Sequence, residues 1–247
     1  MTIRLLSAAL VAGFLAACVA SGLQFALTSP LILEAETYES HSALPVPGGH
    51  AALRANPLIV QAHAGHGGEA AWQPAAGLPR LAFTALATLV SGVGYALLLG
   101  AALVASGRGI TAGEALRFGI GGFLAASLAP AIGLPPELPG IEAAALQSRQ
   151  LWWVATAVAT AAGLALIALR RTPVAIAAGI ALIAAPQVWG APPAPESVSL
   201  LPAATAAKFA ARSLAIAFVF WAVLGLGFGW AWTAVARGRA APAVRSA

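Results

Sequence analysis

Long stretches without a charged residue constrain the fold of this chain more than any other feature. Such a stretch crosses a bilayer when it holds about 20 mostly apolar residues, because the hydrocarbon core is ~30 Å thick. Polar and apolar residues do not alternate with a period of two in these stretches, so we expect helices rather than a β-barrel. The six runs that are long enough comprise residues 5–33, 81–107, 118–136, 150–169, 172–195 and 213–236.

The composition agrees with a membrane protein. Apolar residues make up 60% of the 247 residues and charged residues only 9%, whereas soluble domains are about a quarter charged. We therefore predict an all-α, polytopic helical membrane protein with about six transmembrane helices, five being the alternative. Residues 1–247 would form a single membrane domain. Contact with the lipid bilayer is expected, and contact with nucleic acid is not, because the basic residues occur in ones and twos beside the apolar runs.

The charge distribution predicts an orientation. With the N-terminus in the cytoplasm and six spans, more of the basic residues lie on the cytoplasmic side, as the positive-inside rule requires. Arg170 and Arg171, in a tight turn between two runs, are the firmest markers of that side. Both termini would then be cytoplasmic. Of the eight Glu, only Glu114 would lie inside, where Thr111 and Glu114 fit a capping box.

Residues 28–79 are predicted to form a long outer loop between the first and second spans. All four His of the chain fall in it, and imidazole and carboxylate groups are the ligand types that divalent first-row metals accept. The alternative is a solvated loop in which the His are incidental. The candidate metal ligands are His63 and His66, which are three residues apart, with His41, His50, Glu34, Glu36 and Glu39.

Prolines interrupt several runs near their outer ends. Pro130 and Pro186 each follow an Ala and precede a Gly and a Pro-Pro pair, and the first run also leaves the membrane through a proline, Pro30. This suggests three helix pairs related by an internal repeat. Interrupted spans in corresponding positions point to a transporter binding site. The candidate residues of a transport path are Gln24, Glu137, Glu142 and Gln187.

The sequence gives little support to catalysis. The chain has no Asp, which excludes an aspartyl-phosphate pump and a Ser-His-Asp triad. The single lysine, Lys208, follows no glycine-rich phosphate loop, and no Gly-x-Ser-x-Gly elbow is present. His is absent from every span, so a haem-binding subunit is disfavoured. We expect no enzyme; the less favoured alternative is a membrane enzyme that acts on lipid or quinone, for which no catalytic set is recognisable.

Several stretches together resemble the predicted cobalt transporter subunit family called CbtA. The specific ones are residues 133–140, which read Gly-Leu-Pro-Pro-Glu-Leu-Pro-Gly, and residues 149–153, which read Arg-Gln-Leu-Trp-Trp. Looser matches cover residues 28–39, His63 with His66, residues 72–80, residues 185–187 and residues 190–192.

The resemblance implies a multi-pass protein of the bacterial inner membrane that takes up cobalt for cobalamin biosynthesis. It also implies a small one-span partner with a His-rich tail, called CbtB. The family is described with five spans, and the run at 118–136, short and broken by Pro130, is the one whose loss would give five. No cofactor is expected, since Co²⁺ would be the transported substrate.

Two functions remain open at this point. In the first, the chain is a divalent-metal permease that captures its ion through the outer loop. Capture would weaken below about pH 6.5, because a protonated imidazole cannot bind a metal. In the second, the chain is a non-transporting membrane scaffold whose outer loop binds a partner protein.

Overall fold

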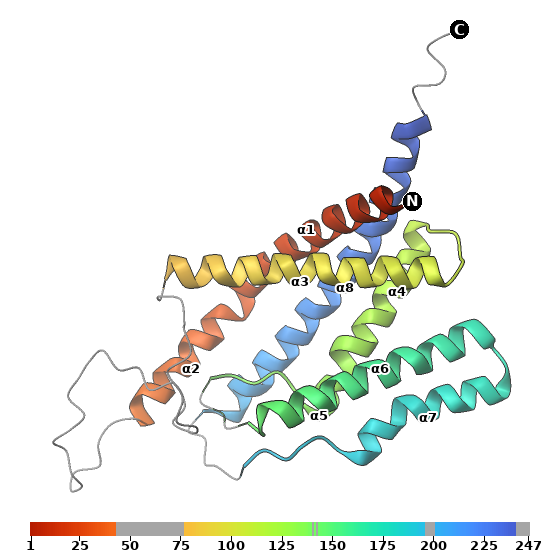
Figure 1. The fold of residues 1–247 in the computed structure, drawn as a ribbon. Coiled ribbons are helices and arrows are strands. Elements are labelled where there is room, and N and C mark those ends of the chain that lie inside the picture. Colours follow the sequence, from red (N-terminus) through yellow and green to blue (C-terminus); the bar gives the residue numbers. More distant parts are fainter. Residues whose placement is uncertain (43–76, 140, 142, 196–200, 241–247) are drawn as a thin grey trace, which may run out of the picture.

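The computed structural model describes residues 1–42, 77–139, 141, 143–195 and 201–240, and every element in them is helical (Figure 1). The all-α prediction is therefore confirmed. The elements are α1 (Thr2–Leu27), α2 (Ser29–Ser42), α3 (Leu78–Ala105), α4 (Ala112–Phe123), the π-helix η1 (Leu124–Leu128), α5 (Ala129–Gly133), α6 (Leu146–Arg170), α7 (Pro173–Trp189) and α8 (Ala203–Ala240).

Five helical segments in the described residues are long and apolar enough to cross a membrane. They are α1, α3, the continuous stretch Ala112–Gly133, α6 and residues Ala203–Arg237 of α8. The prediction of a polytopic helical membrane protein is confirmed, and the sixth expected span corresponds to the shorter helix α7. Helix α7 returns antiparallel to α6 (Figure 1).

Helix α7 is shorter than its apolar run because both of its ends are set by local chemistry. Pro173 starts the helix, and the Thr172 hydroxyl accepts a hydrogen bond from the Ala175 N–H at 3.2 Å. Gly190, with φ of 90°, ends it. The residues after Gly190 are uncharged and were counted in the run, but they are not helical. The span expected to be short, at residues 118–136, instead belongs to the 22-residue stretch Ala112–Gly133.

Both termini of the bundle lie at one end, as expected for six passes. The Arg4 Nε donates to the Trp232 carbonyl at 2.7 Å, and the guanidinium lies 4.1 Å from the centre of the Trp232 ring. We call this the terminal end; it also holds the α3–α4 connection and the α6–α7 turn (Figure 1). The opposite end, which holds α2 and the start of α3, is called the α2 end.

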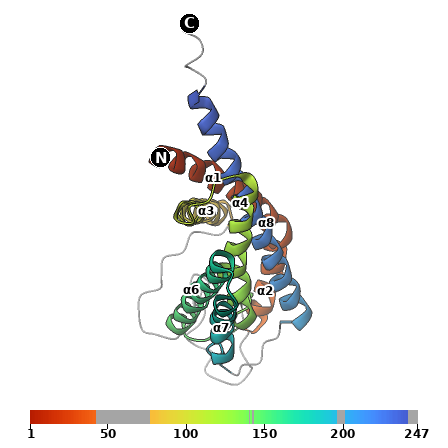
Figure 2. The same cartoon turned by 90° about the vertical axis from the view of Figure 1, so that its right-hand side faces the viewer.

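Glycines bring the helices of the bundle into contact. The pair α4 and α8 lies between α1 with α3 on one side and α6 with α7 on the other (Figures 1 and 2). A Cβ added at Gly92 of α3 would lie 2.7 Å from the Gly13 carbonyl of α1, and one at Gly225 of α8 would lie 2.6 Å from the Ala115 carbonyl of α4. The hydrophobic effect does not drive helices together within lipid, so close packing of this kind stabilises their association.

The first part of the predicted outer loop is a helix. Residues 29–42 form α2, which packs through Leu31 and Ala35 against Leu138. The predicted outer loop at residues 28–79 therefore begins with a helix; its position outside the membrane stays a prediction, and residues 43–76 lie outside the described residues. The helix is tied to α3 by an ion pair between Glu36 and Arg80 at 3.0 Å.

The three helix pairs suggested by the sequence do not pack as equivalent units. In the described residues, α1 packs against α3, but α7 packs mainly against α6 rather than α8, and α4 packs mainly against α8 rather than α6. The prolines that prompted the idea do share a location. Pro30, Pro130 and Pro186 all lie toward the α2 end of helices that run in the same direction (Figure 1).

Candidate functional site

A proline-rich segment leaves α5 at the α2 end and brings two charged side chains together. The Leu134 N–H caps α5 by donating to the Pro130 carbonyl at 2.9 Å, and the described residues between α5 and α6 are not helical. Arg149, in the first turns of α6, donates to Glu137 at 3.0 Å. Their side chains are 31% and 23% exposed, so the pair is only partly accessible.

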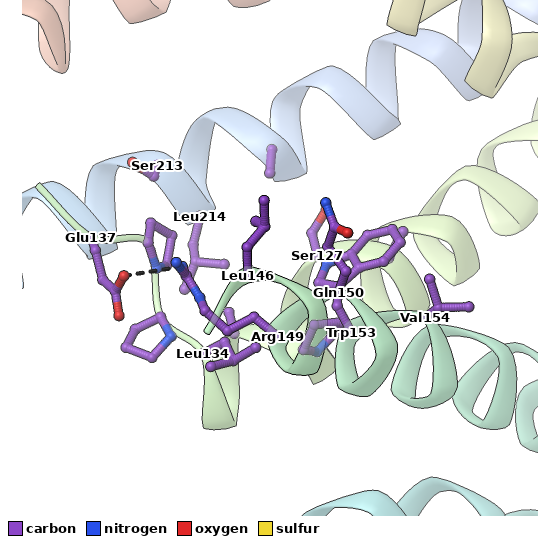
Figure 3. A pocket seen from close by; sticks show the side chains of 16 residues that line it. Ser127, Leu134, Glu137, Leu146, Arg149, Gln150, Trp153, Val154, Ser213 and Leu214 are labelled. Carbon is purple, nitrogen blue, oxygen red and sulfur yellow. Dashed lines mark hydrogen bonds and ion pairs between the residues drawn. The ribbon is translucent and has the colours of Figure 1, made fainter. Parts of the chain in front are cut away.

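This ion pair lines a pocket of about 740 Å³ between the proline-rich segment, η1, the start of α6 and the first half of α8 (Figure 3). Glu137 and Arg149 are the charged residues of its lining, so the described lining carries no net charge. Ser127, Gln150 and Ser213 add neutral polar groups. The two most family-specific stretches of the sequence, at 133–140 and 149–153, thus contribute to one pocket.

The helix behind the pocket is irregular. Between α4 and α5 the chain forms the π-helix η1, and π-helical turns of this kind often occur at functional sites. Side chains from two other helices donate hydrogen bonds to this part of the chain, one to η1 and one to the first residue of α5. The Trp221 Nε1 donates to the Ser127 hydroxyl at 3.1 Å, and the Gln187 amide donates to the Ala129 carbonyl at 2.9 Å.

Pro130 adds to the irregularity because it has no N–H to donate. The carbonyl one helical turn before it therefore lacks its usual donor. Non-helical or unpaired backbone at membrane depth is tolerated only where protein or a water-filled cavity satisfies it. The pocket, the π-helix and Pro130 lie together, and this is the arrangement expected where a polar substrate enters a helical bundle.

Two of the predicted path residues lie at this site. Glu137 lines the pocket, and Gln187 reaches α5 from α7. Gln24 does not join them, because its helix α1 lies on the other side of the α4–α8 pair (Figure 2). At Gln24 the backbone carbonyl instead accepts hydrogen bonds from the hydroxyls of Thr28 and Ser29, at the break between α1 and α2. Glu142 lies outside the described residues.

The predicted metal ligands are only partly described. Glu34 is exposed on α2, and Glu36 is paired with Arg80. Glu39 and His41 belong to the last turns of α2, where the structure does not describe side chains, and His50, His63 and His66 lie outside the described residues. Among the residues that are described, no three His, Cys, Asp or Glu side chains are grouped closely enough to hold a metal ion.

Sequence reasoning missed Arg149 and Ser127 as site residues. Arg149 lies in one of the stretches that resemble the CbtA family. The signal that could have identified it as a partner of Glu137 is its opposite charge. No sequence signal marked Ser127, because a π-helix has no recognisable residue pattern in an Ala-rich chain.

These features define a multi-pass α-helical membrane protein with a mostly apolar pocket, which contains one ion pair, at one end of a proline-broken helix. The chain belongs to the CbtA family, described as probable cobalt transporter subunits, and the family model matches residues 2–233. The resemblance noted from the sequence is thereby confirmed over nearly the whole chain. No curated protein and no solved structure matches it.

Proposed function

We propose that this chain is the membrane component of a Co²⁺ uptake system of the bacterial inner membrane and that the cation enters at the α2 end. Charge supports this orientation. In the described residues, the terminal end carries one acidic residue, Glu114, among Arg4, Arg108, Arg117, Arg170, Arg171 and Arg237. By the positive-inside rule the terminal end is cytoplasmic and the α2 end faces outward.

The observation that carries the entry site is the placement of carboxylates. Glu34, Glu36 and Glu137 all lie at the α2 end, where α3 also begins (Figure 1), and His63 and His66 belong to the sequence between these two helices. Imidazole nitrogen binds middle and late first-row divalent metals more strongly than carboxylate alone. In this proposal His63 and His66 capture Co²⁺, assisted by His41, His50 and the α2 carboxylates.

Glu137 is the next group in the proposed path. A cation that reaches the pocket meets a carboxylate already held by Arg149, so it must displace the guanidinium before it can bind. Gln187 and the carbonyls near Pro130 offer neutral oxygen groups behind it. A small His-rich one-span subunit would supply the ion to the same end.

We expect the double variant His63→Ala/His66→Ala to lose at least about tenfold in Co²⁺ uptake at low metal concentration, because two imidazole ligands are removed. Uptake of radiolabelled Co²⁺ would be measured in cells that lack other cobalt importers, with and without the one-span partner. Ni²⁺ and Zn²⁺ as competitors would define metal preference. The Gln61→Ala variant, in the same segment, is the matched control.

Two results would contradict this proposal. Unchanged uptake in the double variant would remove His63 and His66 from the capture step. No uptake by well-expressed wild-type protein, with or without the partner, would favour a scaffold that binds partner proteins and transports nothing itself.

A further inference from the structure

Helix α6 carries three buried polar groups in a single stripe. Trp152, Thr156 and Thr160 are four residues apart, so their side chains lie on one face of the helix. They are 8%, 0% and 2% exposed. Within the part of the chain that the structure describes, the Trp152 Nε1 and the Thr156 and Thr160 hydroxyls have no hydrogen-bond partner. Burying such a group without a partner costs about 1–3 kcal/mol, so three in a row need an explanation.

Other threonines of the bundle do not behave this way. The Thr84 hydroxyl donates to the Arg80 carbonyl at 2.9 Å, and the Thr88 hydroxyl donates to the Thr84 carbonyl at 2.9 Å. Bonding back to its own helix is the ordinary way for a membrane threonine to satisfy its hydroxyl. Thr156 and Thr160 forgo that bond although they are the more deeply buried, so their hydroxyls are available to another species.

The stripe borders the irregular helix behind the pocket. Helix α6 packs against η1, α5 and α7. The Trp152 ring lies against Gly133 at the end of α5, where an added Cβ would come within 2.6 Å of it. Leu134, the next residue, lines the pocket. The Trp152 end of the stripe therefore lies next to a residue that lines the pocket.

The chemistry of the three groups identifies their ligand. An indole N–H can only donate a hydrogen bond, so its partner must be an acceptor and cannot be a bare cation. A hydroxyl both donates and accepts, so a neutral species that does the same can bridge all three groups. Water is that species, and buried waters typically make about three hydrogen bonds to polar groups that lack protein partners.

We infer that the α6 stripe binds a file of ordered water that continues the pocket into the bundle. Eight residues separate Trp152 from Thr160, which corresponds to ~12 Å along the helix. Beyond it α6 and α7 touch, since a Cβ added at Gly163 would lie 2.5 Å from the Gly179 carbonyl. The row of water molecules therefore extends only part of the way through the bundle and ends where α6 and α7 are in contact. Its role as the inner part of the Co²⁺ path rests on the proposed function.

The water itself can be tested without transport. Hydroxyl radicals generated by X-rays from bound water label the side chains beside it. In the purified full-length protein in lipid nanodiscs, we expect Trp152 to be labelled although it is buried. In the double variant Thr156→Val/Thr160→Val, labelling of Trp152 should fall about tenfold, because two of the three anchoring groups are gone. Trp189, which is 89% exposed at the end of α7, should be labelled equally in both proteins and serves as the dose reference.

Uptake tests the role of the file. Valine has the shape of threonine without the hydroxyl, so the double variant should remain folded, which its elution volume and melting temperature would verify. We expect its Co²⁺ uptake to fall about tenfold, while the control Thr84→Val/Thr88→Val, on the exposed face of α3, keeps wild-type uptake.

Each result bears on a separate claim. If Trp152 resists labelling in the wild type, or if its labelling is the same in the double valine variant, the water file is overturned. If labelling falls but uptake does not, its role in the path is overturned. A wild-type protein that transports no Co²⁺ at all contradicts the proposed function, whereas the labelling result still decides whether the water is present.

Discussion

Replacement of Gly92 with valine should leave almost no folded protein. A Cβ at this position of α3 would lie 2.7 Å from the Gly13 carbonyl and 3.3 Å from the Ala17 Cβ, both on α1. The first contact is with backbone, which cannot move aside as a flexible side chain can. Overpacking a well-packed interior costs about 1–3 kcal/mol, and valine adds two methyl groups beyond the Cβ. The measurement is the monodisperse fraction on size-exclusion chromatography, with the melting temperature of whatever remains.

Gly94 provides the control within the same helix. An added Cβ there would meet nothing within 4 Å, so Gly94→Val should fold like the wild type. Both replacements lower the conformational freedom of the unfolded chain in the same way, so any difference between them reports on the α1–α3 contact. Equal loss in the two variants would show that helix propensity rather than close packing governs this part of the bundle.

Substitutions of the Glu137–Arg149 pair should change Co²⁺ binding in opposite directions. Glu137→Gln removes the carboxylate and leaves the Arg149 guanidinium unpaired in the pocket, so binding should weaken about tenfold and uptake should fall with it. Arg149→Gln frees the carboxylate from its competitor, so binding should become tighter by about the same factor. Calorimetry with Co²⁺ on the purified protein would measure both effects.

A second ion pair separates this effect from a general loss of charge. Glu114 pairs with Arg117 at 2.6 Å, at the terminal end and away from the pocket. Glu114→Gln should leave Co²⁺ binding unchanged. If both pocket variants weaken binding equally, the pair holds the pocket in shape and no exchange between guanidinium and cation takes place there.

The membrane fold could be predicted from the sequence because the bilayer imposes a simple rule on length and charge. Five of the six apolar runs correspond to helices long enough to span. The exception shows the limit of the rule. Counting uncharged residues from 172 to 195 takes no account of Gly190, whose φ of 90° ends α7. A run without charges fixes the maximum length of a span, and local backbone chemistry decides how much of it is helix.

Helix α2 was not predicted from the sequence, because its Glu and Ser residues are typical of a loop. A weaker signal was present. Leu31 and Ala35 are four residues apart, the spacing that places both on one face of a helix, and both are buried against Leu138. One such pair is too little to predict a helix without knowing that Leu138 is there to cover it.

The candidate site was only half predictable for a related reason. Glu137 and Gln187 stood out as polar groups beside prolines in apolar runs, and both lie near η1. Gln24 stood out in the same way but lies on the far side of the bundle, because the order of runs in a chain does not determine which helices become neighbours. Thr156 and Thr160 could not be singled out from the sequence, since a membrane threonine usually bonds to its own helix.

The shortness of α7 has a consequence for the lipids around it. Its 17 residues extend ~26 Å, about 4 Å less than the hydrocarbon layer, whereas α3 on the other side of the bundle has 28 residues and exceeds it. Such hydrophobic mismatch is relieved by local deformation, at a cost of fractions of a kcal/mol per Å. We therefore expect the lipid to be thinner beside α7 than beside α3. This asymmetry draws the headgroup layer inward on the side of the bundle where Gln187 meets α5.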